Sequence, residues 1–292
     1  MKLNQGFSGK GNASIDLQCI QRRFAGCKVG DNEATLRIAK EIEKELATNL
    51  KCKDPKMTWL DTQEQVGFQT QINRLGVIAE VFIEGEVPTS PSIQAVVEAK
   101  DVFIISTHEQ VLDGQVYKGC INPCKAAYRA SIMEAGLKVG KFLAAHGVRG
   151  HFSVDFLACK QPKSGSWDVY AVEVSGTTHP QATMVLLCGG SICSDGIFRT
   201  NDGELRCYVA TDCHYSEKLK GCSEKGLIDA LKCTSSNPAA RKIRWNKADR
   251  IGVVFHLFKF LSTGRIGFTA ISRSVEESQT LFNETVKFLD TF

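Results

Sequence analysis

Two alternating segments joined by a short turn constrain the fold of this chain most strongly. The first covers residues 152–157, where an aromatic or aliphatic side chain stands at every second position. The second runs from Asp168 to Val174 and follows the turn-like sequence Gln161-Pro162-Lys163-Ser164-Gly165-Ser166. Period-two alternation on both sides of a turn predicts an antiparallel β-hairpin. The first predicted strand carries Asp155, and the second carries Glu173 in addition to Asp168 at its start.

Asp155 and Glu173 suggest a cation site. Two ionised carboxylates on neighbouring antiparallel strands repel each other unless a cation lies between them. Mg²⁺ is the usual such cation, because it is bound by one or two carboxylates together with nucleotide phosphates. The spacing leaves the alternative open that Asp155 and Glu173 both face solvent on the polar side of the hairpin.

Helical and strand patterns alternate through the rest of the chain. Apolar residues at helical spacing predict helices over 33–50, 61–75 and 126–146, the first capped by Asp31 and the second ended by Gly76. Ser274 and Glu277 form a Ser-x-x-Glu capping box that starts a final helix. Further strands are predicted over residues 77–86, where the strand runs into a turn, and over 102–106, 206–211, 252–258 and 265–271.

The segment from Lys2 to Asn12 combines a lysine on a short strand with a glycine-rich loop. Glycines let backbone N–H groups converge on anionic oxygens, and the lysine adds a point charge, so the segment could bind a polyphosphate. It is neither a Walker A loop nor a dinucleotide-binding Gly-x-Gly-x-x-Gly motif. Taken alone, it could equally be a frayed terminus.

Composition limits the class of protein. The chain has 292 residues, 43% of them hydrophobic, which is enough for one large or two smaller cores. No apolar run approaches the roughly 20 residues that cross a bilayer, and no signal peptide is recognisable, so we expect a cytoplasmic protein without membrane association. Twelve scattered cysteines fit reduced thiols better than a disulfide framework or a zinc site. A net charge of +4 from dispersed lysines makes no case for nucleic-acid binding.

Several segments, in this order, resemble the ATP-grasp ligases, more closely the branch of the pheganomycin-type peptide ligases and the carboxy-terminal region of the IQ-motif-containing protein H family. The resemblance covers nearly the whole chain. The matching segments are Lys2 with its glycine loop, Ala79-Glu80-Val81-Phe82-Ile83-Glu84-Gly85-Glu86, Ser106-Thr107-His108-Glu109-Gln110-Val111-Leu112, Val154-Asp155-Phe156, Ala171-Val172-Glu173-Val174, Gly176-Thr177-Thr178-His179-Pro180 and Gly252-Val253-Val254-Phe255-His256.

The resemblance implies an α+β ATP-grasp fold in which two α+β subdomains clasp a nucleotide. The implied divisions are residues 1–87 with the lysine strand and adenine hinge, 88–212 with the metal-binding hairpin, and a small α/β domain over 213–292. The α/β domain that usually precedes an ATP-grasp domain is expected to be absent, so the chain reads as a fragment.

The resemblance also implies roles for individual residues. Asp155 and Glu173 would hold Mg²⁺ between the phosphates of ATP, and Lys2 would contact those phosphates and assist catalysis. His179 is a second candidate catalytic residue that could orient the substrate, as could His108. The remaining nucleotide contacts implied are the loop residues Gly6, Ser8, Gly9, Gly11 and Asn12, the hinge residues Glu80, Val81 and Phe82, and Glu86 at the ribose.

The implied chemistry activates a carboxylate as an acyl phosphate, which an amine then attacks. One departure counts against simple transfer of this activity, because the family has an Asn, a Leu and an Arg between the metal-binding glutamate and the Gly-Thr-Thr-His-Pro segment. Here Glu173 is followed by Val174, Ser175 and then Gly176. A catalytically inactive ATP-grasp module and a kinase-like phosphoryl transferase therefore remain alternatives. The small carboxylate or amine substrate and any protein partner are not identified by the sequence.

Overall fold

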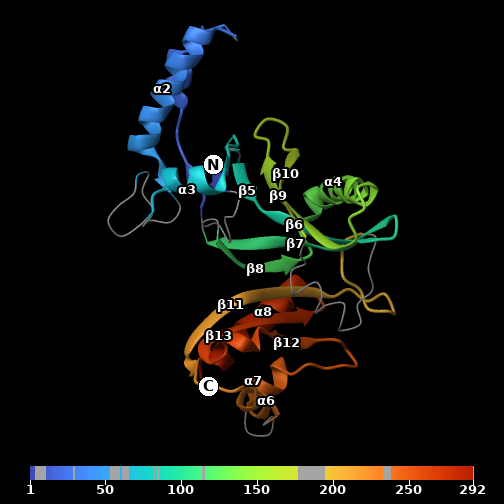
Figure 1. Ribbon diagram of the computed structural model, residues 1–292. Coiled ribbons are helices and arrows are strands. Elements are labelled where there is room, and N and C mark those ends of the chain that lie inside the picture. Colours follow the sequence, from blue (N-terminus) through green and yellow to red (C-terminus); the bar gives the residue numbers. More distant parts are fainter. Residues whose placement is uncertain are drawn as a thin grey trace. The chain divides into compact units, whose positions relative to one another are not determined.

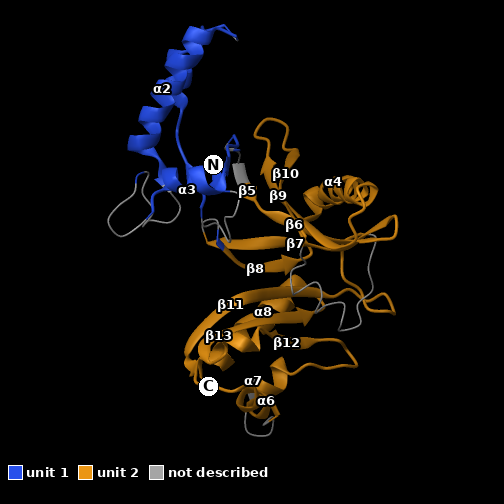
Figure 2. Cartoon of the chain, viewed as in Figure 1, with its two compact units in different colours: residues 1–83, 114–116 blue, residues 84–113, 117–292 orange. Residues whose placement is uncertain are grey.

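The computed structural model describes residues 1–3, 11–28, 30–52, 60, 66–81, 83, 86–113, 116–176, 195–232 and 238–291. These residues fall into two compact units, one made of residues 1–83 with 114–116 and the other of residues 84–113 with 117–292 (Figure 2). The predicted divisions at 87 and 212 stay predictions. Each unit is described separately.

The described part of the first unit consists of short strands and three helices (Figure 1). Strand β1 pairs antiparallel with β4, and β2 pairs antiparallel with β3. Its small core contains Leu3, Ala13 and Phe68, against which Ile72 and Leu75 pack. Its described elements are β1 (Lys2–Leu3), β2 (Ala13–Ser14), α1 (Gln18–Arg23), α2 (Asn32–Asn49), β3 (Lys51–Cys52), α3 (Phe68–Leu75) and β4 (Val77–Ile78).

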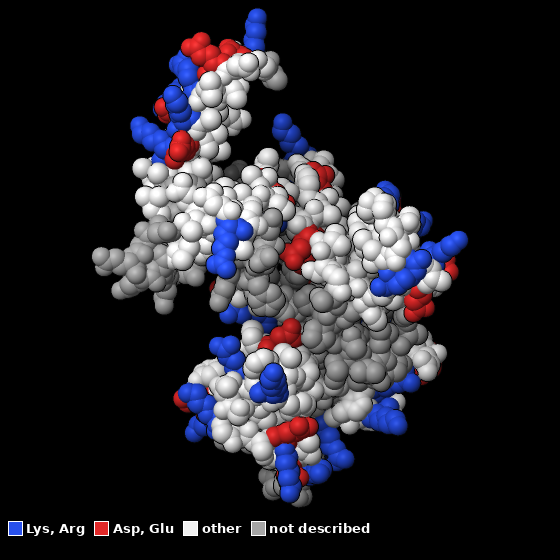
Figure 3. Space-filling view, viewed as in Figure 1, with Lys and Arg blue, Asp and Glu red and all other residues white. Residues whose placement is uncertain are grey.

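Helix α2 begins where the sequence predicts, but it buries little of its apolar stripe. The Asp31 side chain accepts hydrogen bonds from the backbone N–H groups of Glu33 and Ala34, as an N-cap does. Ala34 is the buried residue of the helix, whereas the side chain of Leu36 is 65% exposed. Figure 3 shows basic and acidic side chains interspersed along this helix. Most of its surface is therefore polar or exposed.

Two predicted elements of the first unit begin or end differently. Helix α3 starts at Phe68 with Gly67 as its N-cap, whereas the predicted helix starts at residue 61. Its end at Gly76 is as predicted, with a φ of 78° that suits glycine. Strand β4 ends at Ile78, shorter than the predicted strand, and the side chain of Val81 beyond it is 90% exposed. An exposed side chain has no packing partner to extend the strand.

The second unit is dominated by one antiparallel sheet. Within the described part of this unit, nine strands join it in the order β10-β9-β6-β7-β8-β11-β13-β12, with β5 also paired to β9. Its strands are β5 (Glu86–Thr89), β6 (Pro91–Glu98), β7 (Asp101–Asp113), β8 (Val116–Asn122), β9 (Gly150–Lys160), β10 (Trp167–Ser175), β11 (Cys207–Lys220), β12 (Gly252–His256) and β13 (Thr263–Ser272).

Helices cover two parts of this sheet. Helix α4 (Ala126–Ala145) packs on β6, β7, β9 and β10, and helix α8 (Val275–Asp290) packs on β11, β12 and β13 (Figure 1). The core beneath α4 includes Ile93, Val154 and Phe156, and a second core around Phe268 lies beneath α8. The smaller helices are α6 (Glu224–Lys232), α7 (Pro238–Ile243) and the 3-10 turn η1 (Phe258–Phe260).

The predicted hairpin is confirmed as β9 and β10. The final helix also begins as predicted, because the hydroxyl oxygen of Ser274 accepts a hydrogen bond from the backbone N–H of Glu277 at 3.1 Å. Strands β5, β6 and β8 are not predicted from the sequence. The strand predicted over 206–211 also ends too early, whereas β11 continues to Lys220. None of the helices described here is long and apolar enough to cross a membrane.

Candidate functional site

The register of the hairpin sets the two candidate metal ligands directly opposite each other. Glu173 on β10 is the cross-strand partner of Asp155 on β9. Directly opposed residues of an antiparallel pair lie on the same face of the sheet, with Cβ atoms roughly 4.5–5.5 Å apart. The two carboxylates can therefore share a ligand.

A β-bulge at Val172 produces this register. Trp167, Val169 and Ala171 follow a regular ladder, and Ala171 pairs with Phe156 of the core beneath α4. Strict alternation would send the side chain at 173 to that same helix-covered face. The register shifts between Ala171 and Glu173, so Val172 is the extra residue of β10 and Glu173 faces away from α4.

A second bulge acts in the same way on β7. Gln94 of β6 pairs with Ser106, but the next residue, Ala95, pairs with Ile104, so Ile105 is the extra residue. Ser106 and His108 consequently share a face with Gln94 instead of continuing the apolar side of the strand. We call the resulting surface the polar face; its members are Glu173, Asp155, Ser92 and His108 in one cross-strand row and Ser175, Ser153, Gln94 and Ser106 in the next.

The acid pair fits a divalent cation. Asp155 is half-buried, and its Oδ1 atom is buried without a hydrogen-bond partner among the described residues. Within the described ranges neither Asp155 nor Glu173 forms an ion pair with a Lys, Arg or His side chain. The described residues contain no cluster of three or more His, Cys, Asp or Glu side chains suited to a metal. Two carboxylates suffice for Mg²⁺ when phosphates and water complete its octahedron.

Ser175 lies next to the acid pair on the same face of the sheet, two residues after Glu173 on β10. Its hydroxyl donates a hydrogen bond to Oε1 of Glu173 at 3.3 Å. In the family that this chain resembles, the glutamate is followed by an asparagine that would be a further metal ligand, and that asparagine is missing here. A serine held by the glutamate's own carboxylate orients Glu173 but adds only a neutral hydroxyl oxygen to the pair.

In the first unit, Lys2 is held by its backbone on both sides. It pairs with Ile78 of β4 and forms an isolated bridge with Asn12, and the backbone N–H of Leu3 donates to the carbonyl of Gly11 at 3.0 Å. Gly11 has a φ of 80°, and a Cβ there would lie 3.1 Å from the Leu3 side chain, so a larger residue would be strained. The end of the glycine-rich segment thus returns beside the lysine strand.

Several other predicted nucleotide contacts are placed only in part. Glu80 and Val81 follow β4, and the carboxylate of Glu80 pairs with the Lys2 ammonium at 2.9 Å. Glu86 begins β5, where its backbone pairs with β9. Gly6, Ser8, Gly9, Phe82 and the catalytic candidate His179 lie outside the described residues.

Three other histidines have structural surroundings. His108 is fully buried on the polar face. His146 ends α4, where its Nδ1 lies 2.8 Å from the carbonyl oxygen of Phe142. His256 is 8% exposed on β12, and its ring lies so close to Gly267 that a Cβ there would be 2.3 Å from Cε1. Burial lowers the pKa of His256 to about 4, so it is neutral at physiological pH.

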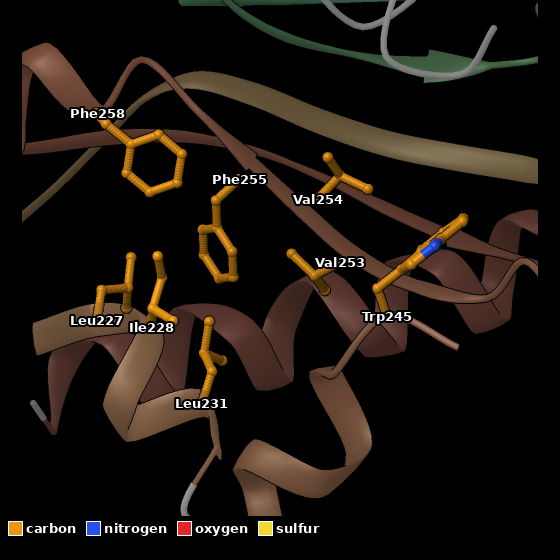
Figure 4. A pocket seen from close by; sticks show the side chains of 8 residues that line it. All are labelled: Leu227, Ile228, Leu231, Trp245, Val253, Val254, Phe255 and Phe258. Carbon is orange, nitrogen blue, oxygen red and sulfur yellow. The ribbon is translucent and has the colours of Figure 1, made fainter. Parts of the chain in front are cut away.

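A separate apolar pocket of about 310 Å³ lies in the carboxy-terminal part of the second unit (Figure 4). Side chains from α6 and β12 approach each other across it, with Trp245 at one side. Because every lining side chain is hydrophobic, the pocket cannot neutralise phosphates or hold a metal. Its lining residues are Leu227, Ile228, Leu231, Trp245, Val253, Val254, Phe255 and Phe258.

The sequence analysis missed most of the polar face because it missed β6. Pro91–Glu98 alternates Ser92 and Gln94 with Ile93, Ala95 and Val97, a pattern that predicts a half-buried strand. This signal was present in the sequence. The two bulges were not predictable in the same way, since no residue pattern in β7 or β10 distinguishes an extra residue from a regular one.

Comparisons with known proteins support the family resemblance. No protein-family model matches the chain. Among curated proteins, L-propargylglycine–L-glutamate ligase of Streptantibioticus cattleyicolor is 28% identical over 215 residues, which is 72% of this chain and 42% of the ligase. The chain therefore spans less than half the length of that relative. The match confirms the resemblance to ATP-grasp ligases.

Two solved structures have a partial likeness to this chain. The phosphoribosylaminoimidazole carboxylase ATPase subunit of Aquifex aeolicus is 13% identical, with a TM-score of 0.45 over 72% of this chain and 58% of that one. An Archaeoglobus fulgidus protein of the ATP-grasp superfamily is 20% identical, with a TM-score of 0.33 over 46% of this chain and 40% of its own.

Proposed function

From the resemblance of this chain to the ATP-grasp ligases, we propose that it binds ATP with Mg²⁺ and belongs to an enzyme that joins a carboxylate to an amine. The observation that carries the proposal is the apposition of Asp155 and Glu173 across the hairpin, with Oδ1 of Asp155 buried and unpartnered among the described residues. Such a pair is unfavourable without a cation and favourable with one.

Different residues of the chain would bind the metal and the phosphates. Asp155 and Glu173 would hold the metal, and Ser175 would keep the Glu173 carboxylate oriented through its hydrogen bond. The ammonium of Lys2 would contact the phosphates, flanked by the returning segment at Gly11 and Asn12. When bound, Mg²⁺ neutralises charge that develops on the transferred phosphoryl group.

In the proposed reaction a substrate carboxylate oxygen attacks the γ-phosphorus of ATP, and ADP leaves. An amine then attacks the acyl carbon, loses a proton, and expels inorganic phosphate, which leaves an amide. Positioning and charge neutralisation are the protein's contribution to both steps. The substrates of the S. cattleyicolor relative are amino acids, as its name states, so an amino acid or small peptide is the first class to screen.

Calorimetric titration with ATP, with and without Mg²⁺, tests the binding site. We expect magnesium-dependent binding that weakens about tenfold or more in Asp155→Asn, because a metal ligand is lost. Asp168→Asn is the matched control: Asp168 is another acid of the same hairpin, bonded to the side-chain amide of Gln161 at 2.5 Å. Equal affinity in all three proteins would refute the site.

A second candidate is a nucleotide-binding module without turnover. The observation that favours it is the shortened segment after Glu173, where only Val174 and Ser175 precede Gly176. The hydroxyl of Ser175 is a weak ligand that donates a hydrogen bond to Glu173. Incubation with ATP and a panel of amino acids separates the two functions. A ligase releases phosphate only when both substrates are present, whereas a module of this kind binds ATP and leaves it intact.

A further inference from the structure

The ion pair between Lys2 and Glu80 connects two residues that the proposed function uses separately. Their side-chain atoms Nζ and Oε2 lie 2.9 Å apart, and the side chains are 37% and 43% exposed. Lys2 is the proposed phosphate contact, whereas Glu80 stands where the ligases read adenine with the backbone. The carboxylate of Glu80 is therefore free to act on the lysine.

The backbone of Lys2 is paired on both sides, so its side chain is the part of the residue that would exchange partners. Lys2 is bonded through β1 to Ile78 on one side and bridged to Asn12 on the other. Strand β1 is anchored by Leu3, which is 6% exposed and packs with the fully buried Phe68. The ammonium can leave Glu80 by rotation of its flexible stem, without any change in the ladder.

We propose that Glu80 is the resting partner of Lys2 and competes with the triphosphate for its ammonium. An anion that approaches Lys2 must replace the carboxylate or accept its repulsion. The proposal rests on the proposed function, because it assumes that Lys2 binds phosphate. Glu80 would act as a positioning residue: it holds the lysine in place before nucleotide arrives and lowers affinity for the phosphates.

The size of the effect follows from exposure. A half-exposed ion pair contributes little, so removing it should change affinity by a modest factor, about two- to fivefold. Both charges are partly in water, so salt should screen the competition. An effect confined to the phosphates distinguishes competition from a structural role, since damage to the hinge would weaken adenine binding too.

Glu80→Gln tests this inference, titrated with Mg-ATP, with inorganic tripolyphosphate and with adenosine. We expect ATP and tripolyphosphate to bind about two- to fivefold more tightly than to the unaltered chain, and the gain to disappear at high salt. Adenosine affinity should not change. Glu80→Asp keeps the charge on a shorter stem and should return phosphate affinity toward that of the unaltered chain.

Glu43→Gln is the control for net charge, because it removes the same charge from an exposed position of α2. If it tightens ATP binding as much as Glu80→Gln does, general attraction explains the gain and the inference fails. Unchanged or weaker phosphate binding in Glu80→Gln also overturns it, while the proposed function survives. If the unaltered chain binds neither ATP nor tripolyphosphate, the proposed function fails and the role of Glu80 fails with it.

Discussion

The two units support their candidate ligands in different ways. In the second unit, Asp155 and Glu173 stand on long strands of a broad sheet above a core that includes Val154 and Phe156. In the first unit, Lys2 stands on a two-residue strand. The buried core of the first unit consists of Leu3, Ala13 and Phe68.

This difference separates a rigid site from an adjustable one. Asp155 stands on β9, which is paired on both sides and whose packed neighbours resist displacement, whereas Glu173 is exposed on the edge strand β10. Lys2 is held by few contacts, and its charge is already paired with an exposed acid. We therefore expect changes in the second unit to affect global stability and changes in the first to affect local opening.

The largest expected effect comes from truncating one core aromatic in each unit. Phe156 and Phe68 are both fully buried. Phe156→Ala should lower the free energy of unfolding by about 3–5 kcal/mol, because the cavity lies in a large core that cannot collapse around it. Phe68→Ala should instead raise hydrogen exchange throughout β1, α3 and β4, with a smaller change in the global transition.

Chemical denaturation combined with peptide-resolved hydrogen exchange measures both quantities. The expected difference between the units is contradicted if Phe68→Ala lowers the global transition as far as Phe156→Ala does, because the two units would then unfold as one. It is also contradicted if exchange in Phe68→Ala rises equally in β9 and β10.

A smaller effect with opposite signs is expected at the acid pair. Asp155→Asn removes one of two directly opposed negative charges, so without metal it should raise stability by a few tenths to about 1 kcal/mol. With Mg-ATP at 100 times its Kd, the unaltered chain should gain about 2.7 kcal/mol and the variant far less. Thermal unfolding in chelator and in Mg-ATP measures both shifts. Identical ligand-induced shifts would show that Asp155 holds no metal.

The sequence predicted the hairpin that carries Asp155 and Glu173, since period-two alternation and a turn with Pro162 and Gly165 are local signals. It could not predict that Glu173 faces Asp155. That outcome depends on the extra residue Val172, and bulges follow from how a strand packs on both neighbours. The side chains of Trp167 and Val169 pack against the core beneath α4 before the bulge, and Val174 pairs with Val154 after it.

In the first unit local signals were accurate for the caps and for the length of α2, and inaccurate for the start of α3 and the end of β4. Asp31 and Gly76 mark a helix start and a helix end as predicted. The strand after Gly76 was predicted too long, because a run of β-favouring residues extends a strand only where its side chains find packing partners. Val81 is 90% exposed and has found none in the described structure.

A pH effect of up to about 2 kcal/mol is expected in the second unit. Burial lowers the pKa of His256 to about 4, against about 6.5 in an unfolded chain. Between about pH 6.5 and 4, the imidazole is protonated in the unfolded state and neutral in the folded state. The free energy of unfolding therefore falls as pH drops through this range. The carboxylate of Asp212, 3.8 Å away, opposes this loss, so 2 kcal/mol at pH 5 is the upper end. Urea denaturation at pH 7 and pH 5 measures it, and His256→Asn should flatten the difference; an equal slope in the variant would assign it to other groups.

The smallest effect compares two helix caps of similar chemistry. Asp31 accepts from two backbone N–H groups at the start of α2, and Ser274 accepts from one at the start of α8. Removing either cap as Ala costs about 1 kcal/mol of helix stability. Since α8 buries Leu281, Phe288 and Leu289 in a core, Ser274→Ala should lower the free energy of global unfolding by that amount.

Helix α2 buries only Ala34 among its described residues, so Asp31→Ala should raise hydrogen exchange in the first turns of α2 and leave the global transition unchanged. A global loss in Asp31→Ala equal to that in Ser274→Ala would mean that α2 is packed as firmly as α8 in solution, and the contrast between the two units would not hold.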